Sequence, residues 1–433
     1  MSEKNELNKL RAGEITVEAS QLRPGVHVRL PLQWMEHQFM FNSFVIADED
    51  QARQIAAMNL PQIYCDLASC RVPPLPKPTV IIPPDPATQA EIARLAEQKA
   101  RQMAEKQERT KVMNELRGRL DTAQKNHAGA AKAVGCAFKS FDANPDESVV
   151  QIAEVSARST AALLSDPDSA IVLIAEKAQA DGSAAHSLSV MTLALLLGKQ
   201  ARLPQDALRA LGIAALLHDI GKSAINSAIL RNTSRNKHEE AIYQTHCRVG
   251  YESALRAKSL TPPMLDAILH HHERIDGKGF PDGLSGKQIH VASRVVAIAN
   301  RFDNLSNPLD PRRALSPAEA LATMWSKEQS AFDVVLLQLF VRAMGVYPPG
   351  TIVLLSDGRV GAVVASAGPE APLSPQVMIH DPETPRRQAI IVDLAKESAV
   401  KIERSLRLQD RSDDELDYLL PRRKLNWFHA ESH

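Results

Sequence analysis

Apolar residues recur at helical spacing almost without interruption between residues 145 and 347, and this pattern restricts the possible folds more than any other feature. Groups spaced three and four residues apart predict amphipathic helices, whose apolar faces must be buried against one another. We therefore expect a single all-α domain over residues 145–345. The predicted helices cover residues 148–164, 168–180, 186–200, 204–220, a stretch through 246, 262–273, 291–305, 317–326 and 332–344.

The first 72 residues predict a small α+β domain. Val26, Val28 and Leu30 alternate with polar residues, as in a half-buried strand, directly after a Pro-Gly turn. The other elements expected here are a short helix over residues 51–58 and a strand over residues 63–65. No catalytic constellation is evident in this part of the chain.

A linker and a long helix are expected next. Prolines are dense between residues 73 and 86, which favours an extended and fairly stiff segment over packed structure. Residues 87–130 are rich in Ala, Glu, Lys, Gln and Arg, a composition that favours a long exposed helix. Because its apolar positions are too irregular for a sustained heptad, we expect a solvated spacer helix, with a dimerising coiled coil as the alternative.

Residues 346–433 predict a short β extension and a charged tail. Alternating apolar residues between 350 and 365, with a turn at Asp357 and Gly358, are typical of a β-hairpin. Another strand is expected over residues 377–379, and the tail from 411 to 433 shows no clear pattern. The chain as a whole is thus predicted to be mainly α, with a small N-terminal α+β domain and a short C-terminal β extension.

Charge and hydropathy exclude several classes of partner. Lys plus Arg equals Asp plus Glu at 51 each, so no global field attracts long nucleic acids or an anionic membrane. No apolar run approaches the roughly 18 residues that span a bilayer, and residues 1–11 lack the features of a signal peptide, which predicts a cytoplasmic protein. The cysteines form no CxxC pair, so we expect reduced thiols at Cys65, Cys70, Cys136 and Cys247.

His218 and Asp219 place an imidazole beside a carboxylate at the end of an apolar helical run, which Gly221 is expected to stop. Neighbouring residues on a helix point about 100° apart, so the pair acts together only through a ligand that lies between the two side chains. A metal ion is such a ligand. Taken alone, the pair favours a capping aspartate beside a hydrogen-bonded core histidine.

Histidines gather in the same domain, where eight of the fourteen lie between residues 186 and 290. His186, His246 and His272 each fall on the apolar face of a different predicted helix. A core histidine is the ordinary interpretation of any one of them, but imidazoles from several helices of one bundle favour divalent metal binding. His238 and His290 lie in polar sequence and are expected at the surface. The eight are His186, His218, His238, His246, His270, His271, His272 and His290.

This ordered set of motifs resembles the HD-GYP family, whose members are cyclic di-GMP phosphodiesterases within the HD metal-dependent phosphohydrolases. The matching segments are His186, HDIGK at 218–222, His246 followed by Gly250, and HHERIDGKGFPDGL at 271–284. GFP stands here in place of the family's GYP, which removes one hydroxyl and keeps the ring. Residues 15–72 also resemble a domain of unknown function that often precedes HD-GYP domains, and residues 346–364 resemble the extension of that subgroup.

The resemblance implies an HD-type helical bundle that holds two divalent transition-metal ions, iron or manganese. It assigns His186, His218 and Asp219 to the first ion and Asp219, His246, His271 and His272 to the second, with Asp219 as the bridge. Such a pair of ions suits phosphodiester hydrolysis. Lys222 would assist the phosphate or the nucleophile as a second catalytic residue beside Asp219, or else is only a cation at a helix C-terminus.

Three departures from the family pattern qualify this transfer. Asn300 stands where family members supply a carboxylate to the first ion, and its uncharged amide should hold metal less tightly. Asp303 matches a non-ligating aspartate and is expected to serve structure. Gly182 replaces a glutamate that permits a third ion in some members, which favours a dinuclear site. The phosphate-contact segment is altered, and the candidates for binding the dinucleotide phosphates are Arg294, Arg312 and Arg313.

Three functions are compatible with these residues. The leading hypothesis is a cytoplasmic enzyme that hydrolyses cyclic di-GMP to pGpG, to GMP or to both. The second is a catalytically weak or inactive receptor, which binds cyclic di-GMP and signals through a homodimer or another partner of the N-terminal domain or the spacer helix. Asn300 favours this second hypothesis. The third is a phosphohydrolase that acts on another nucleotide.

Overall fold

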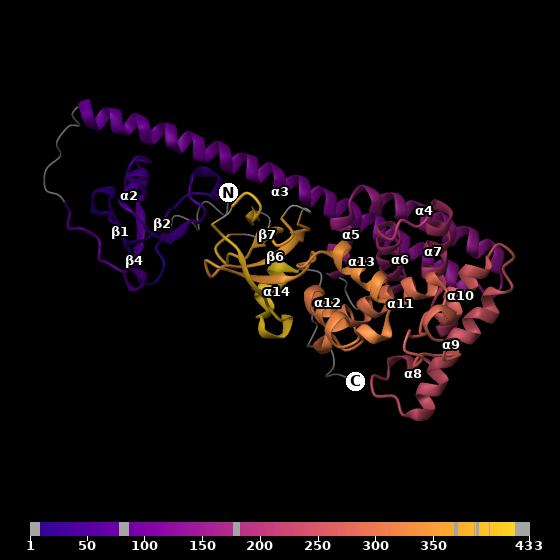
Figure 1. Cartoon of the computed structure of the whole chain (residues 1–433). Helices are drawn as coiled ribbons and strands as arrows, with labels where there is room; N and C mark the ends of the chain where they lie inside the picture. Colours follow the sequence, from indigo (N-terminus) through magenta and orange to yellow (C-terminus); the bar gives the residue numbers. More distant parts are fainter. Residues whose placement is uncertain are drawn as a thin grey trace. The chain divides into compact units, whose positions relative to one another are not determined.

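The structure is a computed structural model that describes residues 9–77, 86–175, 182–367, 371–384, 386, 389–397 and 399–420. The chain divides into two compact units (Figure 1). The N-terminal unit consists of residues up to 116 together with residues 381–390, and the C-terminal unit consists of residues 117–380 together with residues from 391 onward.

The N-terminal unit is built on an antiparallel sheet with the strand order β1-β4-β2-β3. Its elements are β1 (Glu14–Val17), η1 (Ala19–Gln21), β2 (His27–Arg29), η2 (Trp34–Glu36), β3 (Ser43–Val45), α2 (Glu49–Ala56), β4 (Ile63–Asp66) and η3 (Leu67–Ser69). Val28 and Ile63 from the sheet pack with Ile55 from α2 in one buried core. The predicted small α+β domain is therefore confirmed.

The spacer helix expected over residues 87–130 is helix α3 (Pro86–Ser140), which is mostly exposed over the predicted residues and continues ten residues further. Leu95 and Lys106 are buried, so the helix is covered along part of its length. Its last turns continue past residue 130 because Val134 and Ala137 belong to the core of the C-terminal unit. An alanine-rich composition predicts a helix, but it does not show which face is covered by other elements.

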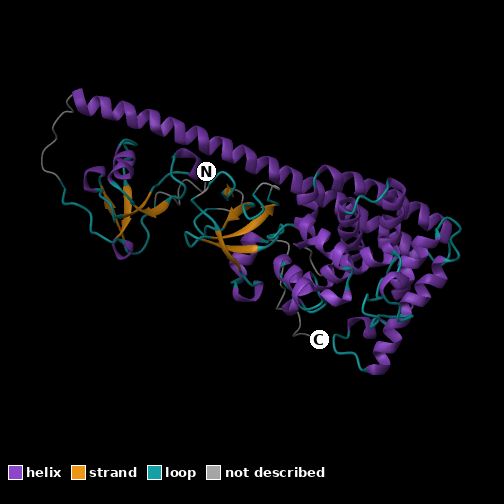
Figure 2. Cartoon of the chain, viewed as in Figure 1, coloured by secondary structure: helices purple, strands orange, loops and turns teal. Residues whose placement is uncertain are grey.

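The C-terminal unit contains a helical bundle around one continuous core, which confirms the all-α prediction for this region (Figure 2). Its helices are α4 (Pro145–Ser165), α5 (Pro167–Ala175), α6 (Gly182–Gln200), α7 (Gln205–Leu217), α8 (Ser227–Arg231), α9 (Lys237–Ala254), α10 (Pro262–His270), α11 (Val291–Ser306), α12 (Pro317–Ser326) and α13 (Val334–Met344). Short 3-10 helices are η5 (Ile220–Ala224), η6 (Gly286–Gln288), η7 (Pro311–Arg313) and η8 (Gln329–Ala331). Helix α6 is buried on nearly every side and lies at the centre of the bundle.

Two predicted helices end earlier than the apolar pattern indicates. The helix expected over residues 204–220 ends at Leu217, and the one expected over 262–273 ends at His270. In each case the next residue is a histidine whose Nδ1 donates to a carbonyl three residues earlier, which satisfies one of the free carbonyls at a helix end. The helix expected over residues 168–180 extends through Ala175, and residues 176–180 lie outside the described part of the chain.

The predicted C-terminal β extension is confirmed, and its sheet contains more strands than the sequence indicated. Strands β5 (Ile352–Leu355) and β6 (Val360–Ala365) form the expected hairpin, with Gly358 at a positive φ of 85° in its turn. They belong to a five-stranded antiparallel sheet, which adds β7 (Gln376–Ile379), β8 (Ile391–Asp393) and β9 (Ile402–Ser405) in the order β8-β7-β6-β5-β9. The short helices η10 (Leu408–Asp410) and α14 (Asp413–Leu419) follow, and residues 421–433 are not described. Strands of three or four residues are too short to show a clear period in the sequence.

None of the helices among the described residues combines the length and the apolar character that crossing a bilayer requires.

Candidate metal centre

The His218-Asp219 pair lies where the chain leaves α7. His218 caps the helix, whereas Asp219 has φ −104° and ψ 13°, so the backbone changes direction between them and enters η5. Both side chains are almost completely buried, and His218 Nε2 lies 3.3 Å from Asp219 Oδ2. The pair was expected within a last helical turn, but the turn of the backbone is what directs both side chains to one point.

Gly221 allows this segment to pack directly against α9. A Cβ atom at residue 221 would lie 2.1 Å from the carbonyl oxygen of His246 and 2.4 Å from the backbone nitrogen of Gly250. Two backbones can approach this closely only where glycine supplies no side chain. The contact therefore sets Asp219 beside the helix that carries His246.

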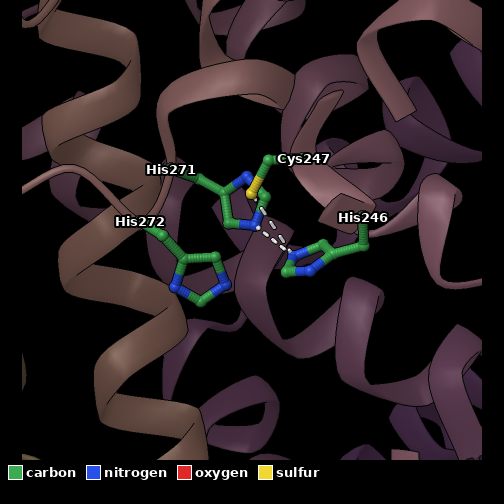
Figure 3. A group of neighbouring side chains, drawn as sticks. All are labelled: His246, Cys247, His271 and His272. Atoms are coloured by element: carbon green, nitrogen blue, oxygen red, sulfur yellow. Dashed lines mark hydrogen bonds between the residues drawn. The ribbon is translucent and has the colours of Figure 1, made fainter. Parts of the chain in front are cut away.

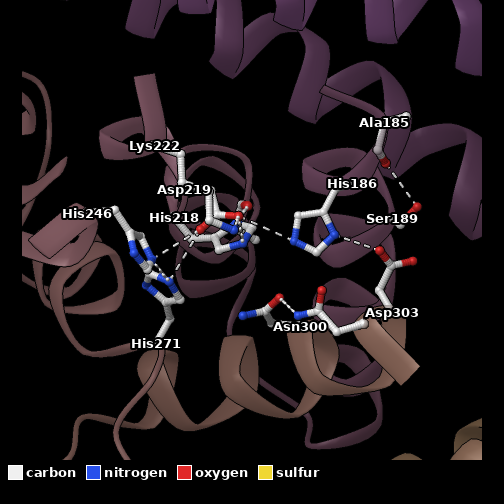
Figure 4. Close-up of polar contacts among 12 residues, drawn as sticks. Ala185, His186, Ser189, His218, Asp219, Lys222, His246, His271, Asn300 and Asp303 are labelled. Carbon is white, nitrogen blue, oxygen red and sulfur yellow. Dashed lines mark hydrogen bonds and ion pairs between the residues drawn. The ribbon is translucent and has the colours of Figure 1, made fainter. Parts of the chain in front are cut away.

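Imidazoles from three further segments converge on the Asp219 carboxylate (Figure 4). His186 comes from α6, His246 from α9, and His271 follows α10. Oδ2 of Asp219 lies 3.5 Å from His186 Nε2, while Oδ1 lies 3.4 Å from His246 Nε2 and 3.6 Å from His271 Nε2. Together with His218, these rings give each carboxylate oxygen two imidazole neighbours.

Hydrogen bonds at the far ring nitrogen fix the tautomer of these histidines. The Nδ1 atoms lie 2.7 Å from Ala215 O in His218, 2.6 Å from Tyr243 O in His246, 2.8 Å from Ile268 O in His271, and 2.6 Å from Asp303 Oδ2 in His186. A carbonyl or carboxylate oxygen only accepts, so Nδ1 carries the proton and Nε2 of the neutral ring is a lone pair. Burial lowers the pKa of His246 to about 3 and that of His271 to about 4, which keeps both rings neutral near pH 7.

Lone pairs and a carboxylate therefore face one another in a buried space, which is unfavourable unless positive charge lies among them. Nε2 of His218 and Oδ1 of Asp219 are buried and have no hydrogen-bond partner. Ligand atoms about 2.1 Å from one ion and at angles of about 90–109° lie about 3.0–3.4 Å apart. The observed separations of 3.3–3.6 Å are close to this range. The donor set fits divalent transition-metal ions, which prefer imidazole and carboxylate.

The potential ligand atoms fall into two groups, and within each group all of them lie within 4.8 Å of one another. The first ligand group is His186, His218 and Asp219, and the second ligand group is His246, Cys247, His271 and His272 (Figure 3). Every histidine that the sequence assigned to metal is thus brought into one of the two groups. Cys247 was missed, because the spacing of apolar residues gives no sign that the residue after His246 also faces the cluster.

Comparison with known proteins identifies two domains. Residues 168–336 match the HD domain family. The C-terminal unit carries an HD domain. Residues 14–152 match a domain of unknown function, DUF3391, which extends the N-terminal resemblance from residue 72 through the whole of α3. The ligand groups described above lie entirely within the HD domain.

Curated relatives of this chain are phosphodiesterases of cyclic dinucleotides by name. The cyclic di-GMP phosphodiesterase PA4108 of Pseudomonas aeruginosa is 33% identical over 221 residues, which are 51% of this chain and 53% of that protein. The cyclic di-GMP phosphodiesterase response regulator RpfG of Xanthomonas campestris is 36% identical over 157 residues, 35% of this chain and 41% of that protein. The 3′3′-cGAMP-specific phosphodiesterase 3 of Vibrio cholerae is 30% identical over 167 residues, 38% of this chain and 36% of that protein. This chain therefore spans about half or less of the length of these relatives.

Lys222 places a positive charge next to the Asp219 carboxylate. Its amine donates a hydrogen bond to Asp219 Oδ2 and lies 5.5 Å from the centre of the Tyr243 ring. Burial lowers the pKa of Lys222, but the attraction of the Asp219 carboxylate outweighs burial, and the net pKa is raised. The amine therefore stays protonated. Tyr243, whose ring also stacks under the Arg235 guanidinium at 4.0 Å, was not predicted from the sequence.

Helix α11 contributes two polar residues beside the first ligand group. Asp303 is fully buried and accepts the hydrogen bond from His186 Nδ1, so it orients the ring of a candidate ligand. Asn300 is also buried, and its Oδ1 accepts a hydrogen bond from Asn304 Nδ2 at 2.7 Å. One lone pair of the oxygen that was expected to bind metal is thus already engaged.

Replacing Asp303 by asparagine should weaken metal binding by the first ligand group by about 10- to 100-fold, as is usual when the partner of a ligand histidine is lost. The amide NH₂ can face His186 Nδ1 and favour the other tautomer, which removes the lone pair from Nε2. Calorimetric titration of metal-free protein with Mn(II) measures the change. Asp142→Asn, which alters an exposed carboxylate, is the control. Equal affinity of Asp303→Asn and the unsubstituted protein would show that Asp303 does not orient a ligand.

The loop after α10 covers the second ligand group. The ring of Phe280 stacks on His272 with centroids 4.5 Å apart and planes 18° from parallel. Glu273 is buried and accepts hydrogen bonds from the backbone nitrogens of Asp282 at 2.7 Å and Leu284 at 3.0 Å, which holds the loop in place. The aromatic ring that the GFP sequence retains is therefore the part of the loop that contacts a candidate ligand.

The three arginines predicted to bind phosphate have other surroundings. Arg294 on α11 donates to the Asp333 carboxylate at 3.0 Å and to Ile289 O at 2.7 Å. Its guanidinium therefore forms an ion pair within the bundle. Arg312 is exposed and pairs with Asp310 at 2.9 Å, and Arg313 is exposed in η7. Within the described part of the chain, none of the three makes a polar contact with either ligand group.

Proposed function

We propose that this chain is a metal-dependent phosphodiesterase that hydrolyses cyclic di-GMP to pGpG, to GMP or to both. The observation that carries the proposal is the Asp219 carboxylate, whose two oxygens each lie beside a separate pair of imidazole nitrogens. A shared carboxylate between two sets of ligands suits a two-metal site that clamps a phosphodiester. The names of the curated relatives support the substrate class.

The first ligand group would hold one ion, and Asp219 with His246, His271 and His272 would hold the other. Iron and manganese are our candidates, because both accept imidazole and carboxylate ligands. When bound, two divalent ions lower the pKa of water and neutralise the charge that grows on the phosphodiester. The protein's own contribution is rigidity, since each Nδ1 hydrogen bond fixes a ring before substrate arrives.

Residues around the ligand groups would bind and orient the substrate. The protonated amine of Lys222 would contact a phosphate oxygen or the attacking water, because it lies at the shared carboxylate. Arg312 and Arg313 are exposed and are proposed to bind the phosphates of the dinucleotide. Arg294, which pairs with Asp333, is the weakest of the three substrate-binding proposals. A cytoplasmic location, and a homodimer or a signalling partner bound through the N-terminal unit or α3, stay predictions.

Product analysis tests the proposed reaction. Metal-free protein is loaded anaerobically with Fe(II) or Mn(II), incubated with cyclic di-GMP, 3′3′-cGAMP or pGpG, and the nucleotides are separated by chromatography. We expect cyclic di-GMP to be converted in the loaded protein and to stay intact in the metal-free protein. Faster conversion of 3′3′-cGAMP would correct the substrate and keep the reaction class. Recovery of every nucleotide unchanged with both metals would overturn the proposed enzyme.

The second candidate is a receptor that binds cyclic di-GMP without rapid hydrolysis. Asn300 favours it, because this residue brings no charge and its oxygen already accepts a hydrogen bond from Asn304. A first ion held by fewer anionic ligands would be bound less tightly. Tight binding of cyclic di-GMP, with intact ligand recovered after long incubation in Mn(II) and in Fe(II), would establish the receptor and exclude the enzyme.

Substituting aspartate for Asn300 should increase the affinity of the first ligand group for metal. The new carboxylate adds a negative charge to a buried position on the helix that also carries Asp303. We expect at least a 10-fold lower dissociation constant, which corresponds to about 1.4 kcal/mol. Metal analysis after dialysis against a graded series of chelator concentrations measures the change. Asn144→Asp, which adds the same charge at an exposed position before α4, is the matched control. An unchanged dissociation constant in Asn300→Asp would remove Asn300 from the ligand set.

A further inference from the structure

Cys247 lies inside the second ligand group although no CxxC pattern or helical spacing marks it. The residue directly follows His246 on α9 and is fully buried. Its Sγ lies 3.5 Å from His246 Nε2 and within 4.8 Å of the ligand atoms of His271 and His272 (Figure 3). A thiol thus faces the same space as three imidazole nitrogens.

We propose that Cys247 is a ligand of the ion held by His246, His271 and His272, and that this half of the centre therefore takes a thiophilic metal. Iron, zinc and cobalt bind thiolate well, whereas manganese prefers carboxylate, carbonyl and water. The inference rests on the metal centre proposed above but not on its substrate. It separates the two candidate metals, because a sulfur ligand favours iron over manganese at this position.

The distances within the group fit shared coordination of one ion. With sulfur about 2.3 Å and nitrogen about 2.1 Å from one ion, and with ligand angles of about 90–109°, a sulfur and a nitrogen ligand lie about 3.1–3.6 Å apart and two nitrogens about 3.0–3.4 Å apart. The observed separations are 3.5 Å for Cys247 Sγ and His246 Nε2, and 3.4 Å for Nε2 of His246 and of His271. No rearrangement of α9 is needed to bring the thiol to the ion.

A simple S–H hydrogen bond from Cys247 to His246 leaves the other hydrogen-bond acceptors of the group without a donor. The hydrogen bonds at Nδ1 make Nε2 of both His246 and His271 acceptors. Oδ1 of Asp219 is a further buried acceptor without a hydrogen-bond partner, 3.4 Å from His246 Nε2. One weak S–H donor cannot satisfy three acceptors, whereas one cation does so at once. Coordination also removes the thiol proton, which makes sulfur an anionic ligand.

Cobalt(II) titration of metal-free protein tests the assignment, because sulfur-to-cobalt charge transfer absorbs in the near ultraviolet and nitrogen or oxygen ligation does not. We expect this band in the unsubstituted protein and its loss in Cys247→Ser. A protein with Cys65→Ala, Cys70→Ala and Cys136→Ala, in which Cys247 is the last cysteine, should keep the band, and this excludes the buried Cys65 and its neighbour Cys70 as its source. X-ray absorption should show sulfur at about 2.3 Å from the metal in the same proteins.

Measured metal affinities distinguish failure of the Cys247 assignment from failure of the metal centre itself. Cys247→Ser should bind Co(II) or Zn(II) at the second ligand group at least about 10-fold more weakly, the lower limit for losing a partner of a metal site, with a smaller change for Mn(II). Full cobalt binding without a sulfur signal would refute Cys247 as a ligand and leave the metal centre intact. No cobalt binding by folded protein, with or without Cys247, would refute the metal centre itself.

Discussion

Asp219→Asn should lower the proposed turnover of cyclic di-GMP by about 1,000-fold or more and release at least one of the two proposed ions. The Asp219 carboxylate lies beside both pairs of imidazoles, His186 with His218 and His246 with His271. The asparagine side chain has the same shape as the carboxylate but carries no charge. Its NH₂ group would also face the Nε2 lone pairs of the histidines, where a cation is expected. Bound metal ions stabilise the transition state by several kcal/mol, and losing this stabilisation lowers the rate by about 1,000-fold.

The effect is measured as the metal content of the Asp219→Asn and unsubstituted proteins and as the initial rate at which each hydrolyses cyclic di-GMP. Asp142→Asn, an exposed aspartate that pairs with Arg256, is the control for a lost carboxylate and should keep both metal and rate. Circular dichroism verifies that Asp219→Asn is folded. Two bound ions and an undiminished rate in the folded Asp219→Asn protein would contradict the bridging role.

Gly221→Ala should destabilise the HD domain and separate Asp219 from His246. The added methyl carbon would meet the His246 carbonyl oxygen at 2.1 Å and the Gly250 nitrogen at 2.4 Å, and neither atom belongs to a side chain that can rotate away. Overpacking of side chains in a core costs about 1–3 kcal/mol, and a backbone obstacle should cost at least this much free energy of unfolding. Affinity for metal should fall in the same variant, because the candidate ligands Asp219, directly before η5, and His246, on α9, lie on the two sides of this contact.

Urea unfolding followed by circular dichroism measures the stability change. Gly118→Ala is the matched control, since residue 118 lies in α3 with no atom within 4 Å of the added carbon. That control should be neutral or more stable by up to about 1 kcal/mol, because alanine is the better helix former. Equal stability of the Gly221 and Gly118 variants would show that η5 and α9 are not in close contact.

The bundle was predictable because its helices bury one apolar face each. Periodicity at three and four residues located α4, α6, α11 and α12 to within a few residues, since burial of such a stripe is the main force that holds a helix in place. The helix ends were less predictable. His218 and His271 use their side chains to satisfy carbonyls at the end of a helix, and an apolar pattern does not show that kind of interaction.

The candidate ligand residues were predicted by a resemblance of motifs rather than by chemistry alone. Any one of these histidines, taken from sequence, is equally compatible with a hydrogen-bonded core residue, and their Nδ1 atoms do make such bonds. Only the fold shows that the Nε2 atoms meet at one carboxylate. Cys247 was not predictable, because neighbouring residues on a helix usually point in different directions. Only the packing of α9 shows that His246 and Cys247 both face the second ligand group.

The C-terminal sheet and the course of α3 required tertiary information. The strands β8 and β9 have three and four residues, which is too few for a period of two to be recognised. The alanines near the end of α3 predict helix wherever they occur, but Ala137 is buried because the bundle covers it. Long-range packing of this kind decides where an element ends without leaving a local signal.

Anomalous diffraction from crystals loaded anaerobically with iron tests the central claim most directly. Two peaks are expected, one on each side of the Asp219 carboxylate, with nitrogen ligands from His186 and His218 at one and from His246, His271 and His272 at the other, about 2.0–2.2 Å away. A single peak away from Asp219, or none at saturating metal, would contradict the account.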